Sequence, residues 1–439
     1  MTRVLLAALA LAAGSRAGEP IRLSVQPMAA PKPIFRYRLL PEVRELSPGN
    51  PVQWYVRTFQ ERRNFFFGKE AVAERARYRS APLAELPKAN LRDYGGTALR
   101  EADYAARLDT PDWEVLQRVQ AEGADLRLAE LPPLRVLAEA LQVRFRAEVA
   151  DRRFDDAVRT AKTMLALARH LGECPVGAAN QTGLAVAQMA LDTMEEMAQQ
   201  SGCPNLYWAL ADLPSPLVDL RKGFQGDAIL AEAEWRGLRD DPMTETELEE
   251  VIRRLAGASG FAREQAGRPP RSVRAALRSR AGEGEQVRAA RARLVEAGAS
   301  GAALGKLSAV QVILLDERRG QEARRDERLK LLVLPPGQAA GGPAGLFEDL
   351  LPDVPGARRV QGRLEQRVAL LRCVEALRLY AAAHDGKLPA RLSDCGVPLP
   401  ADPFTGKPFR YELDGNSAHL RGGAKETGPE VDYLVTLRK

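Results

Sequence analysis

The residues best suited to acid–base chemistry are His384 and Asp385, which are adjacent in the sequence. They follow an apolar segment with helical spacing and precede Gly386, a residue type that commonly ends helices. A histidine at the C-terminal end of a helix is stabilised by the helix dipole. We therefore interpret the pair as the end of a helix, with a catalytic role for His384 and Asp385 as the alternative.

Other chemistry-bearing residues are too scattered to form a familiar site. The chain has three histidines and neither a His-Glu-x-x-His nor a Cys-x-x-Cys motif, so the sequence predicts no metal site. The segment Gly301–Ser308 departs from a phosphate-binding loop, because only three residues separate its glycines and Leu307 follows the lysine. No Gly-x-Ser-x-Gly motif occurs. We expect no bound cofactor.

A run of arginines is the strongest candidate for binding. Between Arg253 and Arg293 the chain has eleven Arg, three Glu and no Lys or Asp, a net charge of +8, whereas the whole chain carries +6. A helical face of guanidinium groups would suit the phosphate or sulfate groups of an anionic polymer, although an exposed helix in an arginine-rich protein has the same pattern. Four of the arginines recur at steps of three and four residues, as expected for one helical face: Arg268, Arg271, Arg274 and Arg278.

The four cysteines fall into two pairs with different expectations. Cys373 lies in an amphipathic segment and Cys395 in a segment expected to fold back along it, so we predict a disulfide between them. Cys174 and Cys203 flank a predicted helix of about 23 residues, which would separate them by about 35 Å. Those two are expected to be unbridged thiols unless the helix breaks at Gly183.

The N-terminal residues 1–17 have the features of an export signal. Arg3 precedes a short apolar run, Val4 to Ala13, and the small residues Ser15 and Ala17 occupy the −3 and −1 positions of a cleavage site. Later in the chain no stretch of about 18 uncharged apolar residues occurs, so we expect no integral membrane segment after signal removal. The sequence therefore predicts a secreted or periplasmic protein.

Length and composition indicate several structural units of mainly α class. The chain has 439 residues, 45% of them apolar and only 6% aromatic, which favours helices packed through Leu, Ala and Val. We divide it into a signal peptide (1–17), an extended N-terminal arm (18–60), a helical-hairpin body (61–244), an Arg-rich helical segment (245–334), a linker (335–357) and a C-terminal α+β domain (358–439).

The clearest periodicity lies in the middle of the chain. An apolar stripe with a step of four residues comprises Leu137, Leu141, Phe145 and Val149, and Asp151-Arg152-Arg153 interrupts it. A second helix begins near Phe154, and its small residues Ala157 and Ala161 permit close helix packing. This pair resembles a single tetratricopeptide-type helical hairpin, although the 34-residue period does not continue. A third helix is predicted from about Ala178 to Gln200.

The C-terminal end has the pattern of one helix followed by a small sheet. Apolar residues from Leu364 to Leu377 recur with helical spacing, and three later segments have alternating or extended patterns near 409–413, 418–421 and 431–437. Asp414-Gly415 offers a turn between the first two. We predict a helix packed on a three-stranded antiparallel sheet.

Two motifs in this region are similar to the soluble head of the major pseudopilins of type II secretion. They are Lys-Leu-Pro-Ala-Arg-Leu at 387–392 and the segment from Pro400 to Tyr411, which contains Asp-Pro-Phe and ends in Phe-Arg-Tyr. The chain departs from that family because its helix carries Arg359, Arg363, Arg367 and Arg372, and because only Glu430 and Asp432 lie where the family has an acidic calcium loop. The whole chain resembles exported bacterial proteins that join a helical body to such an end, which implies no particular activity.

These observations favour a non-catalytic interaction or scaffold module of the cell envelope. Its expected partners are envelope proteins, with an anionic polymer as a further candidate for the arginine-rich segment. The alternatives are an exported hydrolase with an unrecognised site and an accessory component of a type II secretion-like apparatus. A deep cleft with converging polar groups would favour the enzyme, and an open apolar face would favour the scaffold.

Overall fold

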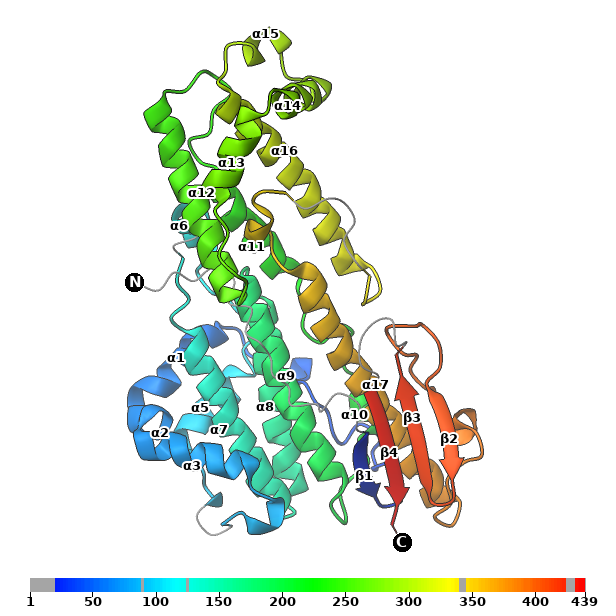
Figure 1. Cartoon of the computed structure of the whole chain (residues 1–439). Coiled ribbons are helices and arrows are strands. Elements are labelled where there is room, and N and C mark those ends of the chain that lie inside the picture. Colours follow the sequence, from blue (N-terminus) through cyan, green and yellow to red (C-terminus); the bar gives the residue numbers. More distant parts are fainter. Residues whose placement is uncertain (1–19, 88–90, 124–125, 339–344, 424–430, 439) are drawn as a thin grey trace.

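The computed structural model describes residues 20–438 except 88–90, 124–125, 339–344 and 424–430. The predicted signal peptide, residues 1–17, lies outside the described residues. The fold is mainly helical with one small sheet, as predicted. Figure 1 shows a helical body, a lobe of helices that projects from one end of it, and the sheet at its side.

Three long helices form the centre of the body: α7 (Leu131–Ala150), α8 (Phe154–Gly172) and α9 (Gly177–Ala198). The predicted stripe from Leu137 to Val149 is fully buried, and the chain turns at Arg152, whose φ is +58°. A Cβ at Gly183 would lie 2.6 Å from the carbonyl oxygen of Ala168, so glycine allows α8 and α9 to pack closely. α9 runs through Gly183 without a break.

Shorter helices cover one side of this centre. Asn50 caps α1 by accepting a hydrogen bond from the backbone N–H of Val52, and Pro51 occupies the first turn. The segment predicted to be extended up to residue 60 therefore ends at residue 50. The covering elements are η1 (Val43–Glu45), α1 (Pro51–Glu61), α2 (Arg63–Phe67), α3 (Lys69–Ser80), η2 (Leu83–Glu85) and α5 (Gly96–Ala105). Of the other short helices, α6 (Leu116–Glu122) lies nearer the projecting lobe and α10 (Tyr207–Ala211) lies near the sheet (Figure 1).

The projecting lobe has a hydrophobic core of its own. Buried residues of this core include Trp235, Leu255, Leu277 and Leu314. Its helices are α12 (Glu245–Gln265), α13 (Val273–Gly282), α14 (Gly284–Glu296), α15 (Gly301–Leu304) and α16 (Ala309–Leu329); α11 (Arg221–Ala233) leads into it, and η4 (Lys330–Val333) follows it.

The segment 335–357, predicted to be a linker, contributes to the lobe core in its described part. Phe347 is fully buried. Its ring packs edge-to-face on the ring of Trp235, with the two ring centroids 5.0 Å apart. Leu346 and Leu350 are buried beside Phe347, and the short helix η5 (Glu348–Leu350) begins at the residue after Phe347. The linker prediction is wrong here, because apolar side chains among the glycines and prolines anchor the segment.

The sheet has four strands and not the three that the sequence predicted. The order is β1-β4-β3-β2, formed by β2 (Arg410–Asp414), β3 (Ser417–Gly422), β4 (Val431–Leu437) and the N-terminal β1 (Ile21–Val25). The three C-terminal strands pair antiparallel, as predicted, whereas β1 pairs parallel to β4 with Leu23 opposite Val435. The added strand buries Leu23 and Val25.

A single long helix connects the lobe to the sheet. α17 (Val354–Ala383) begins at the base of the lobe and ends beside the sheet, and η6 (Leu392–Cys395) follows it (Figure 1). Its buried residues belong to the same core as α7, α8, α9 and the strands. The C-terminal region predicted as a separate α+β domain therefore shares its core with the helical body.

A buried ion pair on α17 joins three distant parts of the chain. Arg378 and Glu375 are 0% and 2% exposed, with nitrogen and oxygen 2.8 Å apart. The guanidinium also donates to the carbonyl oxygens of Gln26, after β1, and Cys203, after α9. Glu375 accepts a hydrogen bond from the backbone N–H of Leu206. Because these bonds engage both charges, the pair is compatible with the core.

We predict that Arg378→Met will destabilise the protein by about 3–5 kcal/mol, because it removes the cation that compensates the buried carboxyl group of Glu375. Urea unfolding followed by circular dichroism measures the change. The double variant Arg378→Met, Glu375→Gln should recover part of the loss.

Arg44→Met is the matched control, since Arg44 is 83% exposed and its pair with Glu42 lies at the surface. Its effect should remain below about 1 kcal/mol. Equal effects of the Arg378 and Arg44 substitutions would contradict the role given to the buried pair.

Candidate anion-binding surface

The four predicted arginines do not lie on one helix. α12 ends at Gln265, and Arg268 and Arg271 follow in a connection that contains Pro269-Pro270. α13 begins only at Val273, where the hydroxyl of Ser272 accepts a hydrogen bond from the N–H of Ala275. The prediction of a single helical face is therefore wrong for Arg268 and Arg271, because the two prolines interrupt the helix.

The lobe nevertheless brings three of these arginines, together with Arg263, onto two carboxylates. Asp349 is 4% exposed at its side chain and contacts Arg263 at 2.9 Å and Arg268 at 3.0 Å. Glu249 of α12 pairs with Arg274 and lies 3.9 Å from Arg278. Each carboxylate thus serves two guanidinium groups, and each cluster keeps one net positive charge.

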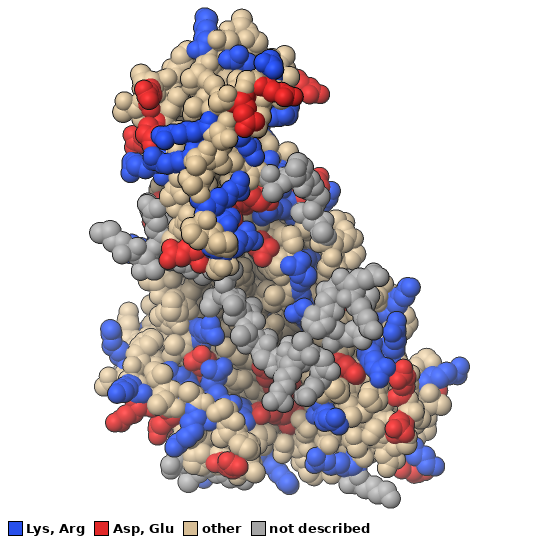
Figure 2. Space-filling view, viewed as in Figure 1, with Lys and Arg blue, Asp and Glu red and all other residues tan. Residues whose placement is uncertain are grey.

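Arg271 lies between these clusters in the sequence and is exposed. Among the described residues the structure records no ion pair for it. We call Arg268, Arg271, Arg274 and Arg278 the basic surface. Figure 2 shows Lys and Arg side chains gathered across the lobe, with fewer acidic ones.

Two other arginines of this segment pair with acidic residues of α16. Arg280 pairs with Glu317, and Arg293 holds Asp316 with nitrogen and oxygen 2.6 Å apart. The charge of +8 between Arg253 and Arg293 is therefore not spread evenly over the lobe. Part of the excess of cations lies where Asp349 and Glu249 are each shared by two arginines.

The sequence offered no signal for Asp349. It lies 81 residues from Arg268, within the segment predicted to be a linker. Only the packing of Phe347 and Leu350 into the lobe core places this carboxylate beside the arginines. Glu249 was equally hard to find, because it is one of several acidic residues at the start of α12.

The basic surface can bind anions by charge and by hydrogen bonding. The side chains of Arg278 and Arg268 are 72% and 55% exposed, and that of Arg274 is 39% exposed. Guanidinium groups bind phosphate, sulfate and carboxylate through paired N–H donors. At such exposure the attraction depends on ionic strength, because salt screens charges over about 10 Å at 0.1 M.

His384 and Asp385 form the end of α17, as interpreted from the sequence. The His384 ring stacks on that of Tyr380 with centroids 3.8 Å apart, and its Nδ1 lies 2.7 Å from the Tyr380 carbonyl oxygen. Asp385 has a φ of +51°, and Gly386 donates its N–H to the carbonyl oxygen of Ala381. Within the described chain no hydrogen bond joins His384 to Asp385, so the geometry is that of a helix end.

All four cysteines are free, buried thiols, so the bridge predicted between Cys373 and Cys395 is not formed in the structure. Burial raises the pKa of Cys373 to about 12 and that of Cys395 to about 11. Both thiols are held protonated, the form that does not attack disulfides. Cys174 and Cys203 lie beyond opposite ends of the unbroken α9, in agreement with the expectation that they do not pair.

The comparisons with known proteins return nothing that assigns a role to this surface. No protein-family model, curated protein or solved structure matches the chain. Over the residues that the structure describes, no group of three or more His, Cys, Asp or Glu side chains is placed to hold a metal ion. In the same residues, no helix combines the length and the apolar character needed to cross a membrane.

A buried carboxyl group at the crossing of α9 and α11 is another titratable group that sequence analysis missed. Asp227 accepts a hydrogen bond from the backbone N–H of Gly177 at 3.0 Å, while its Oδ2 has no partner among the described residues. A Cβ at Gly177 would lie 2.2 Å from that oxygen, so the two helices meet tightly. Burial raises the pKa of Asp227 to about 7.

We predict that Asp227→Asn will stabilise the protein at pH 8 and have little effect at pH 4. The unfolded carboxyl ionises near its ordinary pKa of 3.8, whereas the folded one stays protonated up to about 7. Asp227 therefore costs stability as pH rises through this window, and the isosteric amide avoids that cost.

Chemical denaturation of both proteins at the two pH values measures the difference. We expect the variant to gain about 1–3 kcal/mol at pH 8. An effect of equal size at pH 4 and pH 8 would contradict the assignment, because it would not depend on ionisation.

Proposed function

We propose that this protein is a non-catalytic interaction module of the cell envelope and that its lobe holds an acidic partner on the basic surface. The envelope location rests on the export signal expected at residues 1–17. The binding role is supported by one observation above all: four guanidinium groups share the carboxylates of Asp349 and Glu249. An acidic partner would supply the missing negative charge.

The construction of the lobe supports this proposal. The basic surface lies over a separate hydrophobic core that includes Leu255, Leu277 and Phe347. Asp349 anchors Arg263 and Arg268 from a buried position, so part of the surface is held in place before a partner arrives. Groups that are already ordered lose less conformational entropy on binding.

The composition of the surface favours recognition by charge. Phe261 is the only aromatic residue between Arg253 and Arg293. Proteins that bind single-stranded nucleic acids without sequence preference stack successive bases on aromatic side chains, and this segment lacks such a series. The surface is better suited to carboxylate, phosphate or sulfate groups on an acidic protein or an anionic polymer.

We predict that the double variant Arg271→Glu, Arg278→Glu will bind anionic matrices at least tenfold more weakly than the unchanged protein. Both side chains are exposed, so the fold should persist, and the substitution reverses two charges on the surface. Retention on immobilised poly-glutamate and on a sulfated polysaccharide measures the change at low and high salt.

Arg63→Glu is the control, because Arg63 is an exposed residue of α2 in the body, away from the lobe. It should leave retention near that of the unchanged protein. The same comparison applies to partners captured from envelope extract: salt-sensitive capture that the double variant loses supports the proposal. Capture that persists at high salt, or that both variants retain equally, would exclude the basic surface as the binding site.

A further inference from the structure

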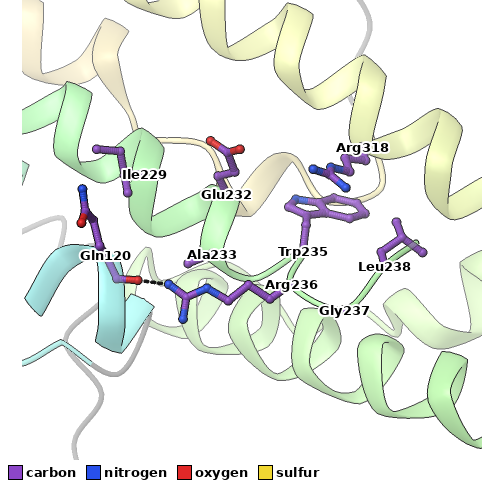
Figure 3. A pocket seen from close by; sticks show the side chains of 9 residues that line it. All are labelled: Gln120, Ile229, Glu232, Ala233, Trp235, Arg236, Gly237, Leu238 and Arg318. Carbon is purple, nitrogen blue, oxygen red and sulfur yellow. Dashed lines mark hydrogen bonds between the residues drawn. The ribbon is translucent and has the colours of Figure 1, made fainter. Parts of the chain in front are cut away.

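A pocket of about 420 Å³ lies where the lobe joins the body. The end of α6, the end of α11, the segment 235–238 and α16 converge on it (Figure 3). This volume is within the range of small-molecule sites, which is roughly 300–1,000 Å³. The pocket is distinct from the basic surface, since it shares none of the four arginines.

An indole N–H without a hydrogen-bond partner lines this pocket. Trp235 is only 3% exposed, and Phe347 holds its ring from the lobe core. Within the described residues the structure records no hydrogen bond for its indole N–H, and Figure 3 shows the indole against the pocket beside Glu232 and Arg318. An N–H at the wall of a pocket can donate to an acceptor that a ligand brings.

Two charged groups at the pocket keep unused bonding capacity. The closest ion-pair partner of Arg318 is Glu322 and that of Glu232 is Arg325, each at 3.9 Å, which is beyond hydrogen-bond distance. In Figure 3 both side chains lie on the same side of the pocket as the indole. The pocket therefore offers the Arg318 guanidinium and the Trp235 N–H to an anionic group, and the Glu232 carboxylate to a cationic one.

The remaining lining divides into structural and apolar parts. Arg236 donates to the backbone carbonyl oxygens of Gln120 and Ala121, so its guanidinium closes the end of α6 and is not free for a ligand. Ile229, 38% exposed, and Leu238 supply apolar surface. A ligand here meets opposite charges together with an apolar wall.

From this combination we infer that the pocket binds a small zwitterion of the α-amino acid class with an apolar side chain. The ligand carboxylate accepts hydrogen bonds from Arg318 and the Trp235 N–H, and its ammonium group pairs with Glu232. The side chain contacts Ile229 and Leu238. The terminal residue of a peptide has either a free ammonium group or a free carboxylate, but not both. A peptide would therefore engage either Glu232 or Arg318, but not both.

Isothermal titration of the full chain with leucine, phenylalanine, leucinamide and N-acetyl-leucine tests this inference. We expect both amino acids to bind and each blocked derivative to bind at least tenfold more weakly, because one charge is missing. Arg318→Gln should reduce leucine affinity at least tenfold, Glu232→Gln should do the same, and Trp235→Phe should reduce it several-fold.

Arg319→Gln is the matched control, because Arg319 is 62% exposed, adjoins Arg318 on α16 and pairs with the same Glu322. It should leave leucine binding unchanged, and circular dichroism checks that all variants fold. Absence of leucine and phenylalanine binding, equal binding of N-acetyl-leucine, or equal effects of Arg318→Gln and Arg319→Gln would each overturn the inference. None of these outcomes depends on whether the basic surface binds polyanions.

Discussion

The buried pair of Glu375 and Arg378 is the interaction on which the arrangement of the chain depends. Two charges in a core cost more than their mutual attraction returns unless other groups complete their hydrogen bonds. Here the completing groups come from the N-terminal segment after β1 and from the turn after α9. The ion pair is stable only when α17, the segment after β1 and the turn after α9 are packed together. It therefore helps to specify this arrangement of the chain.

A second polar contact also joins α9 and α17 to the sheet. Glu195 of α9 accepts hydrogen bonds from Arg367 of α17 and from the hydroxyl of Tyr433 in β4. Burial raises the pKa of Glu195, and the cation of Arg367 opposes that shift. With α9, α17 and β4 fixed in this way, the base of the lobe has a firm support, and both the basic surface and the pocket are built above it.

Local patterns predicted much of the secondary structure. The apolar stripe from Leu137 to Val149, the break at Arg152 and the small residues of α8 follow from residue type and spacing alone, and the structure has the corresponding helices. The alternation of apolar and polar residues likewise predicted the three C-terminal strands. The candidate site was less accessible: its arginines were visible, but Asp349 became a partner only through packing of a segment rich in glycine and proline.

The sequence by itself determined the helical class, the strand pattern at the C-terminal end and the concentration of arginine between Arg253 and Arg293, because these properties depend on residues close together in the chain. Tertiary structure decided the parallel pairing of β1 with β4, the sharing of Asp349 and Glu249 among four arginines, and the pocket around Trp235. Each of these joins residues far apart in the sequence, and periodicity contains no information about which distant surfaces meet.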